Sequence, residues 1–367
     1  MSTRLDAFVV CVPGLEQFAL AEAQRLGVRP ARAVRGGVEC TATWPQLWAL
    51  NVRSRVATRV LVRVRRFKAD GFHSLEMGLK AVPWSSWLSP DAGAQVSVTT
   101  DAGSKLYHSG AVEERVREVL DRPDGDQRVF VRILDDVVTV SLDTSGDSLH
   151  RRGYRGAAGK APLRETLAAG LVLASGWDAR SPLIDPFCGS GTIAIEAAMI
   201  ARRMSPGRHR SFAFQQWPEF DAAGFERVLR GADGDVVAKC PPIMGSDRDE
   251  GAVAAAVENA AAAGVGDAVS FAARSVSDLQ VPSGRTGWIV SNPPYGVRVG
   301  GGSGAGADLR NLYARFGDIA RERAAGWRVA VLAPDDVPLG QARLPFESVV
   351  TTTNGGLPVA VRVASVP

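Results

Sequence analysis

In the second half of the chain, short apolar runs alternate with helical stretches, and this alternation limits the possible folds more than any other feature. Helical spacing is expected over residues 163–175 and 250–263, with strands at 183–184, 243–246, 269–272, 286–291 and 327–333. Buried strands joined by helices form a parallel, doubly wound sheet. The runs 347–352 and 359–364 flank Asn354-Gly-Gly and predict a hairpin. We therefore predict an α/β, Rossmann-like domain whose seven-stranded, mostly parallel sheet ends in an antiparallel hairpin.

Residues 1–150 follow a different pattern, in which strands are mixed with two or three helices, so an α+β region is expected there. The Gly- and Arg-rich stretch 143–162 is the expected junction. We predict a lead-in α+β subdomain at 1–55, a second α+β domain at 56–148, a linker at 149–162, and the α/β domain at 163–367 with an insertion at 202–240.

The first motif that carries chemistry is Asp185-Pro186-Phe-Cys188-Gly189-Ser-Gly191-Thr192, which follows a buried strand and opens a helix. Its glycines allow a sharp turn and a close approach of the backbone to a ligand. The amino end of the helix favours a carboxylate or a phosphate. The pattern also fits the dinucleotide fingerprint, so by itself it does not separate NAD from S-adenosylmethionine.

Two acidic residues after the following strands extend the predicted cofactor site. A dinucleotide site expects an acidic residue about 20 positions after the glycines, whereas Asp247 lies more than 50 residues beyond Gly191. It still ends a strand, where a carboxylate can accept both ribose hydroxyls, and Arg248 adjoins it. Asp249 is the better candidate for the helix N-cap. Asp278, after the third strand, is placed to accept the adenine amine.

The strongest motif is Ser291-Asn292-Pro293-Pro294-Tyr295-Gly296, which also follows a strand. An amine conjugated to a ring is a poor nucleophile because its lone pair is delocalised. The Asn292 oxygen and the Pro293 carbonyl can each accept one N–H, which directs the lone pair toward a methyl donor. The prolines hold these acceptors rigidly, and Tyr295 can stack on a planar base. The predicted catalytic residues are Asn292, Pro293, Pro294 and Tyr295.

At these motifs the sequence resembles the THUMP-containing class I RNA guanine-N2 methyltransferases, and most closely the bacterial enzymes that form N2-methylguanosine in 23S ribosomal RNA. The stretches Leu149-His-Arg-Arg-Gly-Tyr-Arg155 and Ala161-Pro-Leu-Arg-Glu-Thr-Leu-Ala168 add to the likeness, which is close over 149–300 and looser elsewhere. Some members carry a second methyltransferase domain downstream, whose activity is not expected of this sequence.

The resemblance implies S-adenosylmethionine as the cofactor, a THUMP RNA-binding domain at 56–148, and structured RNA as the partner. It implies Asp247 on the ribose, Asp278 near the adenine and Asn292–Tyr295 around the target guanine. The residues expected to contact the cofactor are Asp185, Pro186, Cys188, Gly189, Gly191, Thr192, Asp247, Arg248, Asp278 and Asn292.

The distribution of charge also favours a polyanionic partner. The net charge is only +4, but residues 151–210 hold ten basic against four acidic side chains. An alternative is a compositional bias toward arginine, with solvated basic faces. The residues predicted to bind RNA are Arg151, Arg152, Arg155, Lys160 and Arg164 at the junction, and Arg63 and Arg65 in the expected strand 56–67.

Other features exclude some classes of protein and leave others open. No apolar run approaches the roughly 20 residues of a membrane span, and the four cysteines have no metal-type spacing. We expect a cytoplasmic protein that binds neither a membrane nor a metal. Alternatives are a transfer-RNA guanine-N2 methyltransferase, a methyltransferase that acts on adenine N6, cytosine N4 or protein glutamine, a non-catalytic RNA-binding assembly factor, and an NAD dehydrogenase.

Overall fold

The structure is a computed structural model that describes residues 4–156, 163–295 and 305–367, with backbone only for 305–307. The described chain divides into two compact units. The first comprises 1–11, 19–149 and 209–231, and the second comprises 12–18, 150–208 and 232–367. The chain therefore passes between the units several times.

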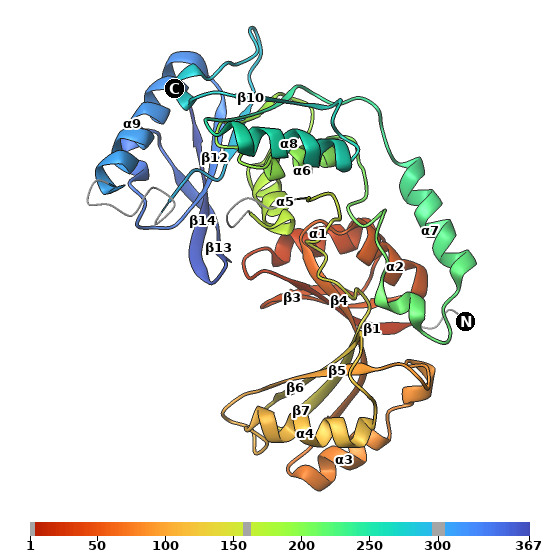
Figure 1. The fold of residues 1–367 in the computed structure, drawn as a ribbon. Coiled ribbons are helices and arrows are strands. Elements are labelled where there is room, and N and C mark those ends of the chain that lie inside the picture. The colour runs from red at the N-terminus through yellow and green to blue at the C-terminus, as the bar shows by residue number, and fades with distance from the viewer. Residues whose placement is uncertain (1–3, 157–162, 296–304) are drawn as a thin grey trace. The chain divides into compact units, whose positions relative to one another are not determined.

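The first unit is built on a seven-stranded sheet in the order β2-β3-β1-β4-β7-β6-β5 (Figure 1). Its strands are β1 (Leu5–Cys11), β2 (Ala31–Val34), β3 (Gly37–Ala42), β4 (Ala57–Lys68), β5 (Ala94–Thr100), β6 (Gln127–Leu134) and β7 (Val137–Asp143). Its helices are α2 (Trp44–Arg53), α3 (Phe72–Lys80) and α4 (Ser109–Leu120), together with most of α1 (Glu16–Arg25). Strand β4 joins the two halves of this sheet, because it pairs with β1 and β7, both antiparallel. The prediction of an α+β region is confirmed.

The alternation of buried and less buried side chains along β4 allows this strand to take part in both halves of the sheet. Val60 and Val62 are buried, whereas Arg66 and Lys68 near the end of the strand are exposed. The register shifts between Arg63 and Arg65, so the strand bulges where its pairing passes along β7. A bulge inserts an extra residue and increases the local twist.

Aromatic side chains of the insertion complete the core of the first unit. The indole rings of Trp87 and Trp217 meet edge to face with centroids 5.3 Å apart, and Trp44 lies 6.0 Å from Trp217. Phe214 contacts Trp48 of α2 at 6.2 Å. The Trp217 indole N–H donates to the Gln127 side chain of β6 at 2.9 Å. The part of the insertion over 209–231 is therefore packed and hydrogen-bonded within this unit; α7 (Ala222–Gly234) lies mostly in it.

The second unit is a three-layer α/β structure whose sheet has the order β10-β9-β8-β11-β12-β14-β13 (Figure 1). Its strands are β8 (Leu183–Asp185), β9 (Ile243–Asp247), β10 (Val269–Ala273), β11 (Trp288–Ser291), β12 (Arg328–Ala333), β13 (Glu347–Asn354) and β14 (Leu357–Ser365). Its helices are α5 (Glu165–Ala174), α6 (Thr192–Ala201), α8 (Glu250–Ala262) and α9 (Ala305–Arg323). Strands β8 to β12 pair in parallel, and β14 is antiparallel to both β12 and β13. The predicted Rossmann-like sheet and its terminal hairpin are confirmed.

Burial explains why these segments adopt the observed elements. Helices α5 and α6 are buried over almost their whole length, and strand β12 is buried at five successive residues, Val329–Ala333. A parallel strand that is covered on both faces needs this continuous apolar run. None of the helices described here has the length and apolar character that a membrane crossing requires.

Candidate active site

The candidate site lies where the strand order of the second unit reverses. Strand β8 is central and pairs with β9 on one side and β11 on the other. The carboxyl ends of these parallel strands lie at the same edge of the sheet, and each ends in a residue from a predicted motif: Asp185, Asp247 and Ser291. Ligands of doubly wound sheets bind at such a reversal.

The loop after β8 has the geometry of a backbone cradle. Gly189 and Gly191 have φ angles of +49° and +83°, a region that favours glycine. A Cβ at Gly189 would enter open space, whereas one at Gly191 would lie 2.9 Å from Ala256 and Phe271. Helix α6 starts at Thr192, directly after the loop. The cradle and the helix amino end together fit the carboxylate end of an amino-acid-bearing cofactor.

Asp247 braces this cradle from the end of β9. One of its carboxylate oxygens accepts the Gly189 backbone N–H at 3.0 Å, and the other accepts the Asp249 N–H at 3.1 Å. A carboxylate oxygen has a second lone pair, so these bonds leave capacity for ribose hydroxyls. Asp249 caps α8 by accepting the N–H groups of Gly251 and Ala252, which confirms its predicted capping role.

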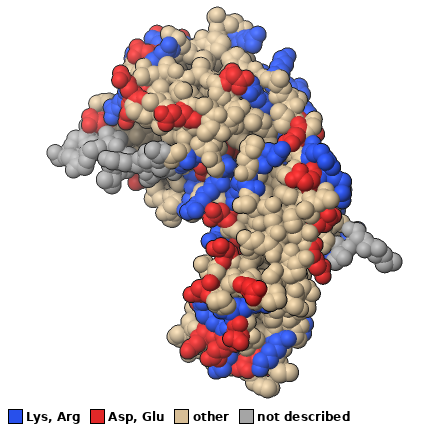
Figure 2. Space-filling model, turned by 45° about the vertical axis from the view of Figure 1, so that its right-hand side comes forward, with Lys and Arg blue, Asp and Glu red and all other residues tan. Residues whose placement is uncertain are grey.

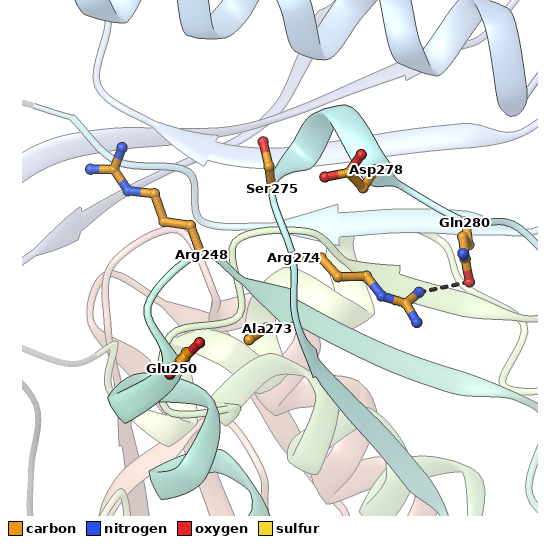
Figure 3. Close-up of a pocket in the computed structure, with 7 residues that line it drawn as sticks. All are labelled: Arg248, Glu250, Ala273, Arg274, Ser275, Asp278 and Gln280. Atoms are coloured by element: carbon orange, nitrogen blue, oxygen red, sulfur yellow. Dashed lines mark hydrogen bonds between the residues drawn. The ribbon is translucent and has the colours of Figure 1, made fainter.

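A cavity of about 430 Å³ opens beside β9 and β10 (Figure 3). Its lining consists of Arg248, Glu250, Ala273, Arg274, Ser275, Asp278 and Gln280. Arg248 lies in the β9–α8 turn and Glu250 opens α8, whereas Ala273 ends β10 and the other lining residues follow it (Figure 3). Arg274 donates to Gln280 at 2.6 Å. The cavity thus brings together Arg248 and Asp278, which the sequence analysis assigned to the cofactor, beside the end of the strand that carries Asp247.

Asp278 is held in place from helix α9. It lies in a short 3-10 turn, Val276–Asp278, in which Ser275 accepts the Ser277 N–H. Arg315 of α9 donates to the Ser277 hydroxyl at 3.0 Å, and Arg323 donates to the Leu279 carbonyl at 2.9 Å. The carboxylate of Asp278 itself remains exposed. An exposed acceptor on a braced turn suits the amine of an adenine ring.

At the end of β11, Asn292 has the property that its proposed role requires. Its side-chain oxygen Oδ1 is buried and has no hydrogen-bond partner among the residues that the structure describes. A buried acceptor without a donor costs free energy, and an N–H group of a substrate would satisfy it. The following residue, Pro293, is buried, and the Pro294 carbonyl accepts the Tyr313 hydroxyl of α9 at 3.3 Å.

Tyr295 is only 6% exposed, and its hydroxyl accepts a hydrogen bond from the Asn354 side chain at 2.8 Å. Its predicted stacking on a base therefore stays a proposal that requires access to one ring face. Among the other predicted cofactor contacts, Pro186 and Cys188 are buried. The Thr192 hydroxyl accepts from Arg155 at 3.0 Å.

The thiol of Cys188 is not suited to nucleophilic chemistry. Burial, together with the nearby Asp185 and Asp247, raises its pKa far above the usual value, and the nucleophilic form of a cysteine is the thiolate. The Cys188 backbone N–H instead donates to the Ser246 carbonyl at 2.9 Å, which joins the cofactor loop to β9.

Two of the arginines predicted to contact RNA form ion pairs with acidic side chains of the protein. Arg152 is 2% exposed at its side chain and pairs with the fully buried Glu196 of α6 at 3.3 Å. Arg155 pairs with Glu165 of α5 at 3.2 Å. Both ion pairs lie inside the second unit and pack the connector against α5 and α6, so an RNA-binding role for either arginine would require these pairs to be exchanged.

The arginines of β4 also have partners within the protein. Arg63 lies 3.1 Å from Glu39 and stacks over the Phe8 ring at 4.8 Å. Arg65 donates to the Ala81 carbonyl at 3.1 Å. Figure 2 shows basic and acidic side chains intermingled over the face drawn, rather than a surface of one sign. To bind phosphates of an RNA, Arg63 and Arg65 would have to give up these contacts within the protein.

Arg151 and Arg164 are the exposed members of the predicted junction set, and Lys160 lies outside the described residues. His150 adds no charge to this set at neutral pH, because burial and the surrounding arginines lower its pKa to about 4.

The structure also reveals residues that the sequence analysis did not single out. Ser291 donates to Asp185, Tyr313 contacts the Pro294 carbonyl, and Asn354 contacts Tyr295. Asn259 of α8 donates to the Ser190 carbonyl of the cofactor loop and accepts the Gly156 N–H. Ser291 stands in a predicted motif and Asn354 in the predicted hairpin turn, but neither had a predicted role at the site; Tyr313 and Asn259 are distant in the sequence from the residues that they contact.

The fold, the glycine cradle and the acceptor loop define a class I methyltransferase with S-adenosylmethionine as its cofactor. Comparison with known families supports this conclusion: the RMKL-like methyltransferase domain family matches residues 152–354, and the RlmL ferredoxin-like domain matches residues 6–61. The chain belongs to the RMKL-like methyltransferase family.

Individual relatives extend the likeness over the whole chain. A putative RNA methyltransferase of Synechocystis is 32% identical over 97% of this chain and 96% of its own length. The ribosomal RNA large subunit methyltransferase K/L of Psychromonas ingrahamii is 34% identical over 90% of this chain, which spans only 46% of that relative. A solved putative methyltransferase complexed with SAH is 27% identical, with a TM-score of 0.87, over 100% of this chain and 99% of that one.

The role of Asp247 is tested by Asp247→Ala. Because the carboxylate both braces Gly189 and faces the proposed ribose site, its loss should weaken binding of S-adenosylmethionine by about 1–3 kcal/mol in calorimetry. Asp249→Ala is the matched control: loss of the α8 cap should cost about 1 kcal/mol of stability and leave cofactor affinity unchanged. An unaltered dissociation constant in Asp247→Ala would remove this residue from the site.

Proposed function

We propose that this chain methylates the exocyclic N2 amine of guanine in RNA, with 23S ribosomal RNA as the substrate. The observation that carries the proposal is the unpartnered oxygen of Asn292, buried at the end of β11 beside the cofactor loop. The substrate class is supported by the names of the Synechocystis and Psychromonas relatives, an RNA methyltransferase and a ribosomal RNA methyltransferase, and by the match of residues 6–61 to the RlmL ferredoxin-like domain.

In this proposal the protein activates the amine by orientation. S-adenosylmethionine supplies an electrophilic methyl group on its sulfonium. The Asn292 oxygen accepts one amine hydrogen and the Pro293 carbonyl accepts the other, so that the nitrogen lone pair points along the line of attack. Such alignment is worth a large part of a reaction barrier. Removal of the proton needs no strong base, since the pKa of the amine falls once the methyl group is attached.

The proposed cofactor contacts follow from the same edge of the sheet. Asp247 would accept the ribose hydroxyls, and Asp278 and Arg248, which line the same cavity from two segments, would bound the adenine pocket. The cradle around Gly189 and Gly191 would hold the carboxylate end, with Asp185, Pro186, Cys188 and Thr192 forming its walls. The orphaned Oδ2 atom of Asp185, a residue only 1% exposed, is a further acceptor at this end of the pocket.

Analysis of the methylated nucleoside tests the proposal. Purified protein and labelled S-adenosylmethionine would be incubated with one substrate at a time: protein-free 23S RNA, transfer RNA, DNA or a protein pool. The products of each reaction would then be digested and separated. We expect N2-methylguanosine from 23S RNA. N6-methyladenosine as the product, or methylation confined to DNA or protein, would refute the guanine assignment, and label in transfer RNA alone would refute the ribosomal one.

Arg151 and Arg164 are the junction residues that we propose to contact RNA. Each phosphate contact contributes close to one unit to the slope of log affinity against log salt. Arg151→Ala/Arg164→Ala should therefore lower RNA affinity at low salt and reduce that slope by about 1–2. Fluorescence anisotropy over a salt series measures both quantities.

The matched control is Arg180→Ala, because Arg180 is also exposed and lies in the α5–β8 connection, at the opposite edge of the sheet from the site. It should leave the slope unchanged. If the double variant and the control gave equal slopes, the junction arginines would not contact RNA.

A further inference from the structure

The carboxyl of Asp185 and the hydroxyl of Ser291 form a buried link between the two functional loops. Ser291 Oγ donates to Asp185 Oδ1, and the Phe187 backbone N–H donates to the same oxygen at 3.2 Å. Ser291 is 0% exposed and Asp185 is 1% exposed. The link therefore excludes water, and one hydrogen bond joins the start of the cofactor loop to the residue just before Asn292.

Strand pairing alone leaves the two loops less firmly joined. Strands β8 and β11 pair at Leu183–Trp288 and Ile184–Ile289. Beyond these two residue pairs, the side-chain hydrogen bond between Asp185 and Ser291 connects the ends of the two strands. A shift of about 1 Å at an acceptor such as Asn292 can reduce a rate by about 10²-fold, so the position of this strand end has functional weight.

We propose that Ser291 is a positioning residue, which acts through Asp185 to hold the strand end that carries Asn292 against the loop that binds the cofactor. The proposal rests on the site described under "Proposed function" but not on the identity of the methylated base. It gives Ser291 a role in the reaction without contact to substrate or cofactor.

The unpartnered oxygen of Asp185 provides a way to observe this link separately from turnover. Within the described part of the chain, Oδ2 is buried without a hydrogen-bond partner, and the α-ammonium group of the cofactor is a donor of the required charge. The pKa of Asp185 is raised to about 7, chiefly by burial and further by the nearby Asp247, against the bonds from Ser291 and Phe187, which lower it. The Cys188 thiol also faces this carboxyl and stays neutral.

The sign of the pH dependence follows from the charge of the partner. A cationic ammonium favours the ionised carboxylate, so cofactor affinity should fall as the pH drops through about 7. Removal of the Ser291 hydroxyl removes a bond that lowers the pKa of Asp185, so the midpoint of this fall should move to higher pH. A purely structural role for Ser291 would leave the midpoint where it is.

Calorimetric binding of SAH from pH 5.5 to 9 therefore tests the proposal without any RNA. For Ser291→Ala we expect a midpoint shifted upward by at least half a pH unit, about 0.7 kcal/mol in the interaction. Affinity at pH 9 should stay within about twofold of the unaltered protein, because the carboxylate is ionised there. Ser291→Thr, which retains the hydroxyl, should keep the original midpoint, and Asp185→Asn should remove the transition.

Single-turnover methyl transfer at saturating cofactor gives the second readout. Ser291→Ala should lower the rate constant by about 10–100-fold while its melting temperature tracks that of Ser175→Ala. Ser175 is also buried, and its hydroxyl donates to the Val172 carbonyl, but it follows α5 at the far edge of the sheet. An unshifted midpoint in Ser291→Ala, or a rate loss that Ser175→Ala reproduces, would overturn the proposal, whichever base is methylated.

Discussion

Asn292→Ala should abolish measurable methyl transfer, a loss in kcat of at least about 10²–10³, while cofactor affinity changes little. The side-chain oxygen of Asn292 is the unpartnered acceptor at the end of β11. Without it the target amine keeps its lone pair delocalised into the ring and is no longer directed toward the donor. Single-turnover transfer to RNA and calorimetry with SAH, measured on the same preparation, separate these two effects.

Two further variants sharpen this expectation. Asn292→Asp keeps an acceptor oxygen and should retain part of the turnover, whereas Asn292→Leu should retain none. Asn311→Ala removes an exposed asparagine of α9 and serves as the matched control with full activity. If Asn292→Ala turned over as fast as the unaltered protein, the activation of the amine by hydrogen bonding would be rejected.

The second large effect is expected for a variant of Arg152, in the free energy of unfolding rather than in the affinity for RNA. Arg152→Met should destabilise the protein by about 3–5 kcal/mol, because it leaves the buried carboxyl group of Glu196 without its cationic partner. Glu196 is 0% exposed, and its other hydrogen bond from this segment comes from Tyr154 at 3.4 Å. Urea unfolding monitored by a signal from the second unit measures the difference.

The double variant Arg152→Met/Glu196→Leu is the informative control, since replacing both members of a buried pair by apolar groups is often close to neutral. It should recover most of the lost stability. Wild-type stability of Arg152→Met, together with a reduced salt dependence of RNA binding, would instead support the predicted contact of Arg152 with RNA.

The second unit follows closely from its sequence because its signals are local. The continuous apolar runs of β11 and β12 have the pattern of strands covered on both faces, and Asn354-Gly-Gly marks the hairpin turn. The first unit was harder to predict. Helix α2 has a weak sequence signal, because its apolar residues lie among Trp44, Pro45 and Trp48 and because its burial depends on an insertion about 170 residues further along the chain.

For the candidate site, the sequence predicted where the functional loops lie but not the hydrogen bonds that hold them in place. Asp185, Asp247 and Asn292 follow strands, and parallel strands deliver their carboxyl-end residues to one edge. Hydrogen bonds such as that from Arg315 to Ser277 depend on tertiary packing, which periodicity does not encode. The same limit applies to the arginines: a basic residue near a junction has the same sequence signal whether it faces solvent, as Arg151 does, or a buried glutamate, as Arg152 does.

The aromatic packing of the insertion has a consequence for the order of folding during synthesis. Chains are made from the amino terminus at about 5–20 residues per second, but the first unit contains residues up to 231. Its early strands must therefore wait, with Trp44 and Trp48 uncovered, until Phe214 and Trp217 have left the ribosome. The connector, α5, β8 and α6 emerge in that interval. We expect nascent chains that stop shortly after residue 149 to be protease-sensitive, and those extended well past residue 231 to be resistant.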